Sequence, residues 1–158
     1  MAGRITAAED QLRGDPKFND KVLSRFINCV MRDGKKATAQ KVVYDAFDLI
    51  EQRTKGEPPA IEVFRKAIEN VKPRVEVRSK RVGGANYQVP MQVNRRRQQS
   101  LAFRWIINSA RGEKGRPMAD ALGKELFEAF NGEGKAMNTR DQTHRMADAN
   151  KAFAHFAW

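Results

Sequence analysis

A stretch from about Asn94 to Arg111 constrains the fold of this chain more than any other. Its apolar side chains have helical spacing up to Gly112, and they spread around most of the helical circumference. They are Leu101, Ala102, Phe103, Trp105, Ile106 and Ile107. A helix that is apolar on almost every side must be covered by other elements, so the stretch predicts a central core helix.

The polar side chains of this helix form one narrow stripe. They are Arg97, Ser100, Arg104, Asn108 and Arg111. The arginines recur every seven residues, which places them roughly 10 Å apart at about 1.5 Å of rise per residue. They could pair with acids on neighbouring helices. Because few acids lie nearby in the sequence, we favour contact with phosphate groups instead.

Positive charge is concentrated around the same helix. Residues 71–116 hold 12 of the 30 Lys and Arg residues but only 2 of the 19 Asp and Glu residues. Most of the formal net charge of +11 therefore lies in less than a third of the chain. Concentrated like charge does not favour folding, so it indicates a polyanionic partner. No basic amphipathic surface helix stands alone, which favours nucleic acid over a membrane.

The first part of the basic region predicts a β-hairpin arm over residues 74–93. Apolar and polar residues alternate on both sides of Gly83 and Gly84. We expect a three-residue loop, 82–84, because it places Val77 opposite Val89 and gathers the apolar side chains on one face. A two-residue loop would place Arg78 opposite Val89 and mix the faces.

Five further helices are predicted by apolar periodicity, and the resulting fold class is mainly α. We expect a six-helix single domain over residues 1–158, with a protruding two-stranded β-hairpin arm between helices three and four. Helix one should begin near Asn19 or Asp20, and helix six at a capping box of Thr139 with Gln142. Residues 1–19 show no periodicity and should form a flexible N-terminal tail. The aromatic C-terminus should dock either on this domain or on a partner.

The first helix and the turn after it predict a second basic surface. Lys21, Arg25 and Arg32 lie on the face opposite its apolar side, and Lys35 and Lys36 follow Gly34. A solvated charged face is the commoner explanation of such a pattern. No acid interrupts this face, however, so we include it in the predicted interface.

The sequence gives little support for catalysis, a cofactor or a metal. Gly132 and Gly134 lack the spacing of a phosphate-binding loop, and the acids are scattered. Two His residues and the single Cys29 show no zinc-ligand pattern. Cys29 should be a small buried or half-buried side chain, and one cysteine suits a reducing cytosol. We find no apolar run long enough for a membrane span and no secretory signal pattern.

Three blocks of the sequence carry a resemblance to a known family. They are residues 20–46 around FIN, DGKK and VVYDAF; residues 75–111 around EVRSKRVGGANYQVP, RRR and LAFRWII; and residues 116–158 around RPMADALGKEL, DQTHRMADANKAF and AHFAW. The chain resembles the universal ribosomal protein seven family of the bacterial small subunit. The resemblance covers all but about the first fifteen residues.

The resemblance implies a structural, non-enzymatic role on the cytoplasmic ribosome. The family is a primary binder of small-subunit ribosomal RNA and nucleates assembly of the 3′ major domain, the head. Its β-ribbon reaches the subunit interface beside the exit-site transfer RNA. The implied protein neighbours are small-subunit ribosomal proteins nine and eleven, the latter near the C-terminal region.

The predicted RNA-binding residues come from the resemblance and from the charge pattern together. Matching positions imply ribosomal RNA contacts at Lys35, Lys36, Arg74, Arg78, Arg81, Arg95, Arg96, Arg97 and Arg111. The basic stripes and the basic region add Lys21, Arg25, Arg32, Lys80, Arg104, Lys114 and Arg116. The ribbon tip, Val82, Gly83, Gly84 and Ala85, would lie nearest transfer RNA.

Two other classes of protein remain as alternatives at this stage. One is an architectural DNA-binding protein with a β-arm, although such arms often insert an apolar or proline wedge and this tip is Gly83 and Gly84. The other is a nucleic-acid-processing enzyme, which would need an acidic or metal site formed only in the fold.

Overall fold

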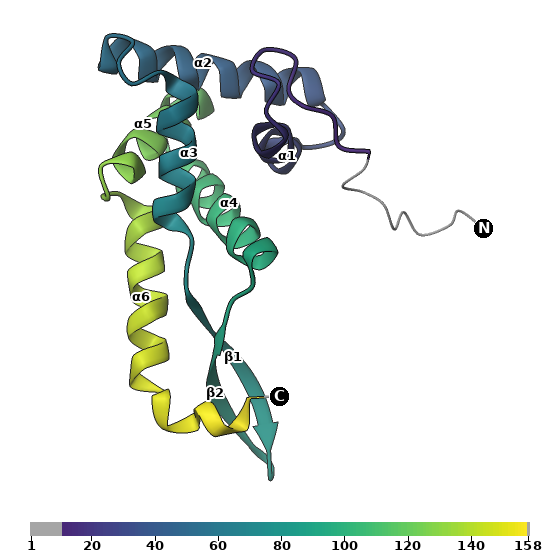
Figure 1. Cartoon of the computed structure of the whole chain (residues 1–158), viewed down its shortest axis with the longest axis vertical. Coiled ribbons are helices and arrows are strands. Elements are labelled where there is room, and N and C mark those ends of the chain that lie inside the picture. The colour runs from purple at the N-terminus through teal and green to yellow at the C-terminus, as the bar shows by residue number, and fades with distance from the viewer. Residues whose placement is uncertain (1–10, 158) are drawn as a thin grey trace, which may run out of the picture.

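Six α-helices and one antiparallel β-hairpin form the described part of the chain in the computed structural model (Figure 1), which covers residues 11–157. The elements are α1 (Lys21–Val30), α2 (Lys36–Thr54), α3 (Ala60–Val71), β1 (Val75–Val82), β2 (Ala85–Gln92), α4 (Arg95–Arg111), α5 (Met118–Phe130), α6 (Lys135–Ala149) and a short 3-10 helix, η1 (Lys151–Phe156). The predicted mainly α fold with a hairpin between helices three and four is confirmed, and η1 is an additional element.

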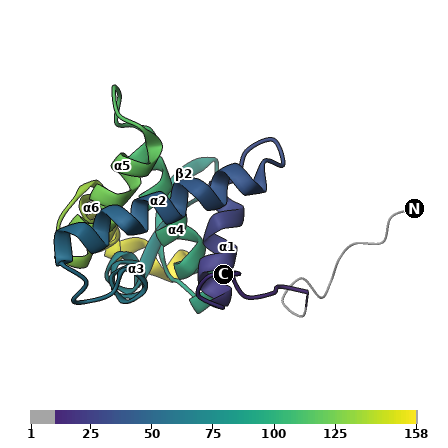
Figure 2. The ribbon, with the colours of Figure 1, turned by 90° about the horizontal axis from the view of Figure 1, so that it is seen from above.

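The core surrounds α4, as its apolar circumference predicts. This helix packs against α1, α3, α5 and α6. The ring of Phe26 lies 5.2 Å from both Phe64 and Phe103, in edge-to-face geometry, and so joins α1 to α3 and α4. Figures 1 and 2 show α2 across one end of the bundle, where it contacts α3 and α5.

The start of α1 is fixed by the carboxylate of Asp20, as predicted. This carboxylate accepts hydrogen bonds from the backbone N–H groups of Val22 at 2.7 Å and Leu23 at 3.0 Å. It also accepts from Arg65 on α3, at 2.9 Å from Nε and 2.6 Å from a terminal nitrogen. One side chain therefore caps α1 and ties it to α3.

The end of the segment predicted as a flexible tail is instead packed on the domain. Asp15 is 2% exposed, and its carboxylate accepts hydrogen bonds from the backbone of Lys17 and Phe18 and from the hydroxyl of Tyr44. The ring of Phe18 lies 5.5 Å from that of Phe47. Burial and the bond to Asp15 raise the pKa of the Tyr44 hydroxyl to about 12. The first half of the predicted tail, residues 1–10, lies outside the described residues.

The prediction that helix six begins at a Thr139–Gln142 capping box is wrong. The helix begins four residues earlier at Lys135, and the Thr139 hydroxyl donates to the carbonyl of Lys135 inside it. A carboxylate from another helix supplies the missing cap: buried Glu125 on α5 accepts the N–H of Ala136 at 2.7 Å. Local sequence spacing cannot reveal a cap that arrives through tertiary packing.

The predicted hairpin register is also wrong. The turn has two residues, Gly83 and Gly84, and Arg78 pairs with Val89. Both glycines have positive φ, 58° and 86°, as a two-residue type I′ turn requires. The face that packs on the protein is therefore mixed, with buried Val89 beside charged side chains. The fold tolerates this mixed face because its charged groups have interaction partners. One of these groups is Glu76, which is only 8% exposed.

The aromatic C-terminal segment docks on the arm, which decides between the two predicted alternatives. Tyr87 on β2 lies 5.2 Å from Phe153 and 4.9 Å from Phe156, measured between ring centroids. The ammonium group of Lys80 on β1 donates to the carbonyl of Phe156 at 2.7 Å. Figure 1 shows this segment crossing the hairpin, with α6 alongside. The protruding arm is thus supported by η1 and by α6.

Replacing the cap of α1 tests the role of Asp20. We expect Asp20→Ala to lower the free energy of unfolding by about 1–2 kcal/mol at neutral pH, because two backbone donors lose their acceptor. Burial alone would raise the pKa of Asp20, but its hydrogen bonds to Leu23 and Arg65 lower it below 3.8 overall. The stabilisation is therefore complete above pH 3.8 and is lost as the pH falls through the lower, folded pKa. Denaturant unfolding at several pH values measures it, with exposed Asp45→Ala as control; equal losses in both variants would contradict the assignment.

Removing the C-terminal rings tests the support of the arm. We expect Phe153→Ala combined with Phe156→Ala to increase amide hydrogen exchange in β1 and β2 by tenfold or more, because a two-stranded hairpin is marginal in water without packing. Exchange in α4 should stay unchanged. The exposed Lys151→Ala serves as the control in the same segment. Unchanged protection of the strands would show that the hairpin is ordered without η1.

Candidate nucleic-acid interface

The predicted basic faces of α1 and α4 lie side by side on one surface. The contact between Phe26 and Phe103 sits beneath them and holds the two helices together. Their outward-facing arginines come from both helices and from the turns that follow them. We call the line of Arg95, Arg25, Arg104, Arg111 and Arg32 the cationic seam.

Three hollows follow the cationic seam from the start of α4 to its end. The first is lined by Arg25, Arg95 and Arg96, together with Gln99. The second places Arg104 beside Ser100, Asn108 and Cys29. The third is bordered by Arg32, Lys35, Arg111 and Arg116. Basic groups therefore alternate with amides and hydroxyls along one path, a combination that suits phosphate and sugar contacts.

Arg111 is a half-buried member of the cationic seam that contacts the end of α1. Its guanidinium donates to the carbonyl of Val30, the last residue of α1, at 3.0 Å. Burial and the nearby positive charge of Arg32 lower the pKa of Arg111. Two guanidinium groups that repel one another at a half-buried position create a local positive potential that an anion would relieve.

Cys29 lies on the cationic seam, where it is exposed rather than buried or half-buried as the sequence predicts. Desolvation by neighbouring atoms raises the pKa of the thiol. The positive charges of Arg25 and Arg104 lower it, but by less, so the net shift is upward. The thiol is therefore protonated at neutral pH and is a poor nucleophile.

Arg78 and Arg97 serve a structural role at the base of the arm. Both bind Glu76: Arg78 Nε lies 2.8 Å from one carboxylate oxygen, and two nitrogens of Arg97 lie 3.2 Å from the other. Of the two explanations offered for the arginine stripe of α4, pairing with an acid therefore holds for Arg97. Their side chains remain 45% and 36% exposed, so one buried carboxylate does not seal them from a ligand. Within the described residues, Arg104 of the same stripe has no carboxylate partner.

A polar hollow lies where the arm joins the helices, and among the residues that line it only Arg74 was a predicted site residue. It is lined by Arg74, Gln98, Arg140 and His144 among others. His144 accepts the backbone N–H of Arg74 at 3.1 Å, and burial and the charge of Arg140 lower the pKa of the ring. Arg140 on α6 belongs to no basic stripe in the sequence, so nothing in its local pattern would have identified it.

The predicted site residues fall into two exposure classes, and none is buried. Twelve are exposed: Lys21, Arg32, Lys35, Lys36, Arg74, Arg78, Arg81, Arg95, Arg96, Arg104, Lys114 and Arg116. Four are half-buried: Arg25, Lys80, Arg97 and Arg111. The structure does not join the arm tip, residues 82–85, to the cationic seam, because the hairpin projects away from α1 (Figure 1). Lys114 lies in the connection between α4 and α5.

Residues 11–157 form neither a metal centre nor a membrane-spanning helix. No group of three or more His, Cys, Asp or Glu side chains is placed to hold a metal ion there. In the same part of the chain, no helix combines the length and the apolar character that crossing a membrane requires.

Comparison with known proteins identifies the family. The profile described as Ribosomal protein S7p/S5e matches residues 2–151. The chain belongs to this S7p/S5e family. Its relatives include the small ribosomal subunit protein uS7 of Rhodopirellula baltica, 62% identical over 156 residues, with 99% of each chain covered. The uS7 proteins of Thermotoga maritima (53% identical; 98% of this chain and 99% of the relative) and Methylocella silvestris (51%; all of both chains) are also similar.

Membership of the S7p/S5e family decides between the classes of function. The chain is a structural, non-enzymatic component of the small ribosomal subunit. The hypotheses of an architectural DNA-binding protein and of a nucleic-acid-processing enzyme are therefore set aside. The resemblance inferred from the three sequence blocks is confirmed.

Two arginines on the same face of α4 should respond differently to substitution. We expect Arg97→Gln to lower the free energy of unfolding by about 1–2 kcal/mol, because buried Glu76 loses a charged hydrogen-bond donor. Arg104→Gln should change it by less than about 0.5 kcal/mol, because its head group is exposed. Urea unfolding of the two variants and the wild type measures both values. Equal values for the two variants would show that the structural assignment of Arg97 is wrong.

Proposed function

We propose that the cationic seam and the arm bind the folded RNA of the small subunit, and that the chain is a primary binder that nucleates assembly of the 3′ major domain, the head. The observation that carries the proposal is the cationic seam itself: four arginines from two packed helices and Arg32 from the turn after α1, lined up along three successive hollows. A polyanion of matching shape is the partner that such a surface fits.

The mechanism is electrostatic docking onto a largely preformed surface. Each Arg or Lys that meets a phosphate releases condensed counterions, and this release supplies much of the affinity. Ser100, Asn108 and Gln99 lie between the arginines and can fix the register through phosphate, sugar or 2′-hydroxyl contacts. Because α1 and α4 are joined through the core, the spacing of these groups is set before RNA arrives.

The arm supports a second contact of the same protein. We propose that its tip, Val82, Gly83, Gly84 and Ala85, lies at the subunit interface close to the exit-site transfer RNA. The projection of the hairpin away from the helices and the exposed backbone of its glycine turn support this role. The family resemblance supports ribosomal protein nine as a neighbour, ribosomal protein eleven as a neighbour near η1, and a place on the cytoplasmic ribosome.

The salt dependence of binding tests the cationic seam. We expect log Kd for a transcript of the 3′ major domain to rise steeply with log salt, since each neutralised phosphate contributes about 0.7–0.9 to the slope. Arg95→Gln combined with Arg104→Gln should reduce the slope by about one to two, because two phosphate contacts are lost. Filter binding across a range of potassium chloride concentrations measures both slopes.

The control for this experiment removes the same amount of charge elsewhere. Lys41→Gln combined with Lys55→Gln changes two exposed basic residues of α2 and its C-cap, which line none of the three hollows of the seam. This variant should keep the wild-type slope. A wild-type slope near one, or an equal reduction in both variants, would rule out the cationic seam as the binding surface.

A further inference from the structure

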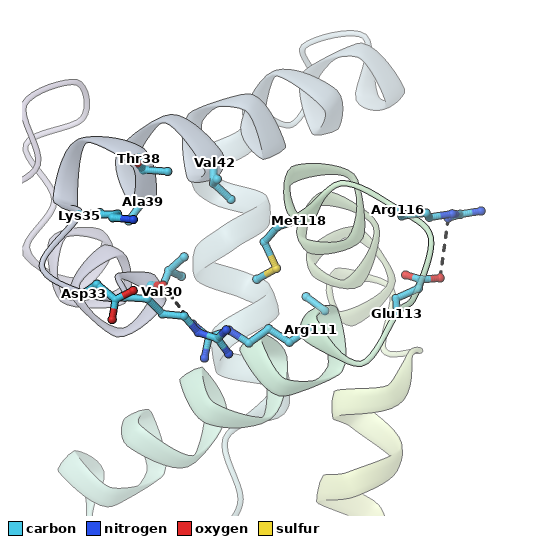
Figure 3. Close-up of a pocket in the computed structure, with 12 residues that line it drawn as sticks. Val30, Asp33, Lys35, Thr38, Ala39, Val42, Arg111, Glu113, Arg116 and Met118 are labelled. Atoms are coloured by element: carbon cyan, nitrogen blue, oxygen red, sulfur yellow. Dashed lines mark hydrogen bonds and ion pairs between the residues drawn. The ribbon is translucent and has the colours of Figure 1, made fainter.

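The third hollow of the cationic seam is the largest of the three. It measures about 440 Å³ and lies between the end of α1, the start of α2, the end of α4 and the start of α5 (Figure 3). Cavities of roughly 300–1,000 Å³ are typical of sites for small organic groups. The hollow is therefore large enough to hold an organic group of its ligand and not only a phosphate oxygen.

Both apolar and basic side chains line this hollow. Met118, Val42 and Val30 contribute apolar surface, and Figure 3 shows the sulfur of Met118 directed between α2 and α4. Arg32 and Arg116 line the same hollow. A nucleotide matches both kinds of side chain, with a base whose faces are apolar and a phosphate on each side of its sugar.

Arg111 provides a planar surface inside the hollow. Figure 3 shows its side chain reaching from α4 towards α1, where the Val30 carbonyl holds the guanidinium at 3.0 Å. A guanidinium held in this way presents a flat, charged face on which a base can stack. Its hydrogen bond is to a neutral carbonyl, so the positive charge is kept.

The two acids of the hollow leave this cationic character in place. Glu113 binds Lys124 at 2.9 Å and lies 3.8 Å from Arg116, so its charge is already balanced by basic neighbours. These contacts also lower the pKa of its carboxyl group. Asp33 is exposed in the turn before α2. Arg32, Lys35 and Arg111 outnumber the single charge of Asp33. The excess of positive charge favours an anionic ligand over a cationic one.

We propose that this hollow receives the base of an unpaired nucleotide of the small-subunit RNA, stacked on Arg111 and Met118, with its flanking phosphates on Arg32 and Arg116. The inference rests on the proposed function and adds to it a base-binding site beside the backbone contacts of the seam. Single-stranded nucleotides in loops and bulges are the part of a folded RNA that can be displaced from the stack in this way.

The test separates base insertion from phosphate contact with two variants. Thr38→Leu combined with Val42→Met enlarges two neutral side chains on the α2 wall and fills the hollow without changing charge. Arg111→Lys keeps the charge but removes the planar face. We expect both to weaken binding of the head-domain transcript roughly tenfold, in the range reported for the loss of one stacked base. The slope against salt should stay at the wild-type value, because no phosphate contact is lost.

Chemical probing of the bound transcript supplies the direct measurement. Dimethyl sulfate for adenine and cytosine, and a carbodiimide for guanine and uracil, should show one unpaired base protected by the wild type and reactive with both variants. Ala37→Leu is the matched control, since it adds the same leucine to an exposed position next to Thr38 that does not line the hollow. Thermal unfolding of each variant establishes that it is folded.

Each other outcome contradicts the proposal in a recognisable way. If the variant with Thr38→Leu and Val42→Met binds and protects the transcript as the Ala37→Leu variant does, the hollow holds no base. If it binds RNA normally but fails to enter reconstituted subunits, the occupant is a segment of a neighbouring protein, which overturns the assignment. If the wild type itself does not bind the transcript, the proposed function fails together with this inference.

Discussion

The contact between Phe26 and Phe103 is the interaction on which the functional surface depends. The two rings meet edge to face at 5.2 Å and pack α1 against α4, the two helices that carry four of the five arginines of the cationic seam. An arginine alone is a flexible cation with a large side-chain entropy. Helices fixed by buried aromatic rings define where each arginine side chain begins, so less conformational freedom remains to be lost on binding. In the proposed function, the core therefore contributes to RNA binding without touching RNA.

Features that depend on local sequence could be predicted well. The helical periodicity around Phe103 identified a core helix, and Asp20 identified the start of α1, because both signals act within one or two turns. Features that depend on packing could not be predicted. The cap of α6 comes from Glu125 on another helix, and the hairpin register followed the backbone geometry of Gly83 and Gly84 rather than the apolar pattern. Turn geometry prevailed because the mixed face found partners in the helices and in η1.

The candidate site shows the same division between local and tertiary information. Charge density alone predicted an interface in residues 71–116 and on the outer face of α1, and those basic residues are exposed or half-buried. What the sequence could not show is which of them meet. Arg32 and Arg111 are far apart in the chain but share one hollow, whereas the arm tip lies away from the seam. Arg140 lines the polar hollow only because α6 lies beside the arm.

Arginines that look alike in the sequence thus perform three different physical tasks along α4. Arg97 neutralises a buried carboxylate and anchors the arm, Arg104 presents its charge to solvent, and Arg111 is held by a backbone carbonyl in the third hollow. The difference lies in the partner that each position meets at its distance along the helix: the hairpin at the start, solvent in the middle, and the end of α1 at the last turn. A helix with a repeating basic stripe can therefore attach the arm through Arg97 and leave Arg104 and Arg111 for the proposed phosphate and base contacts, because the fold supplies a different neighbour at each repeat.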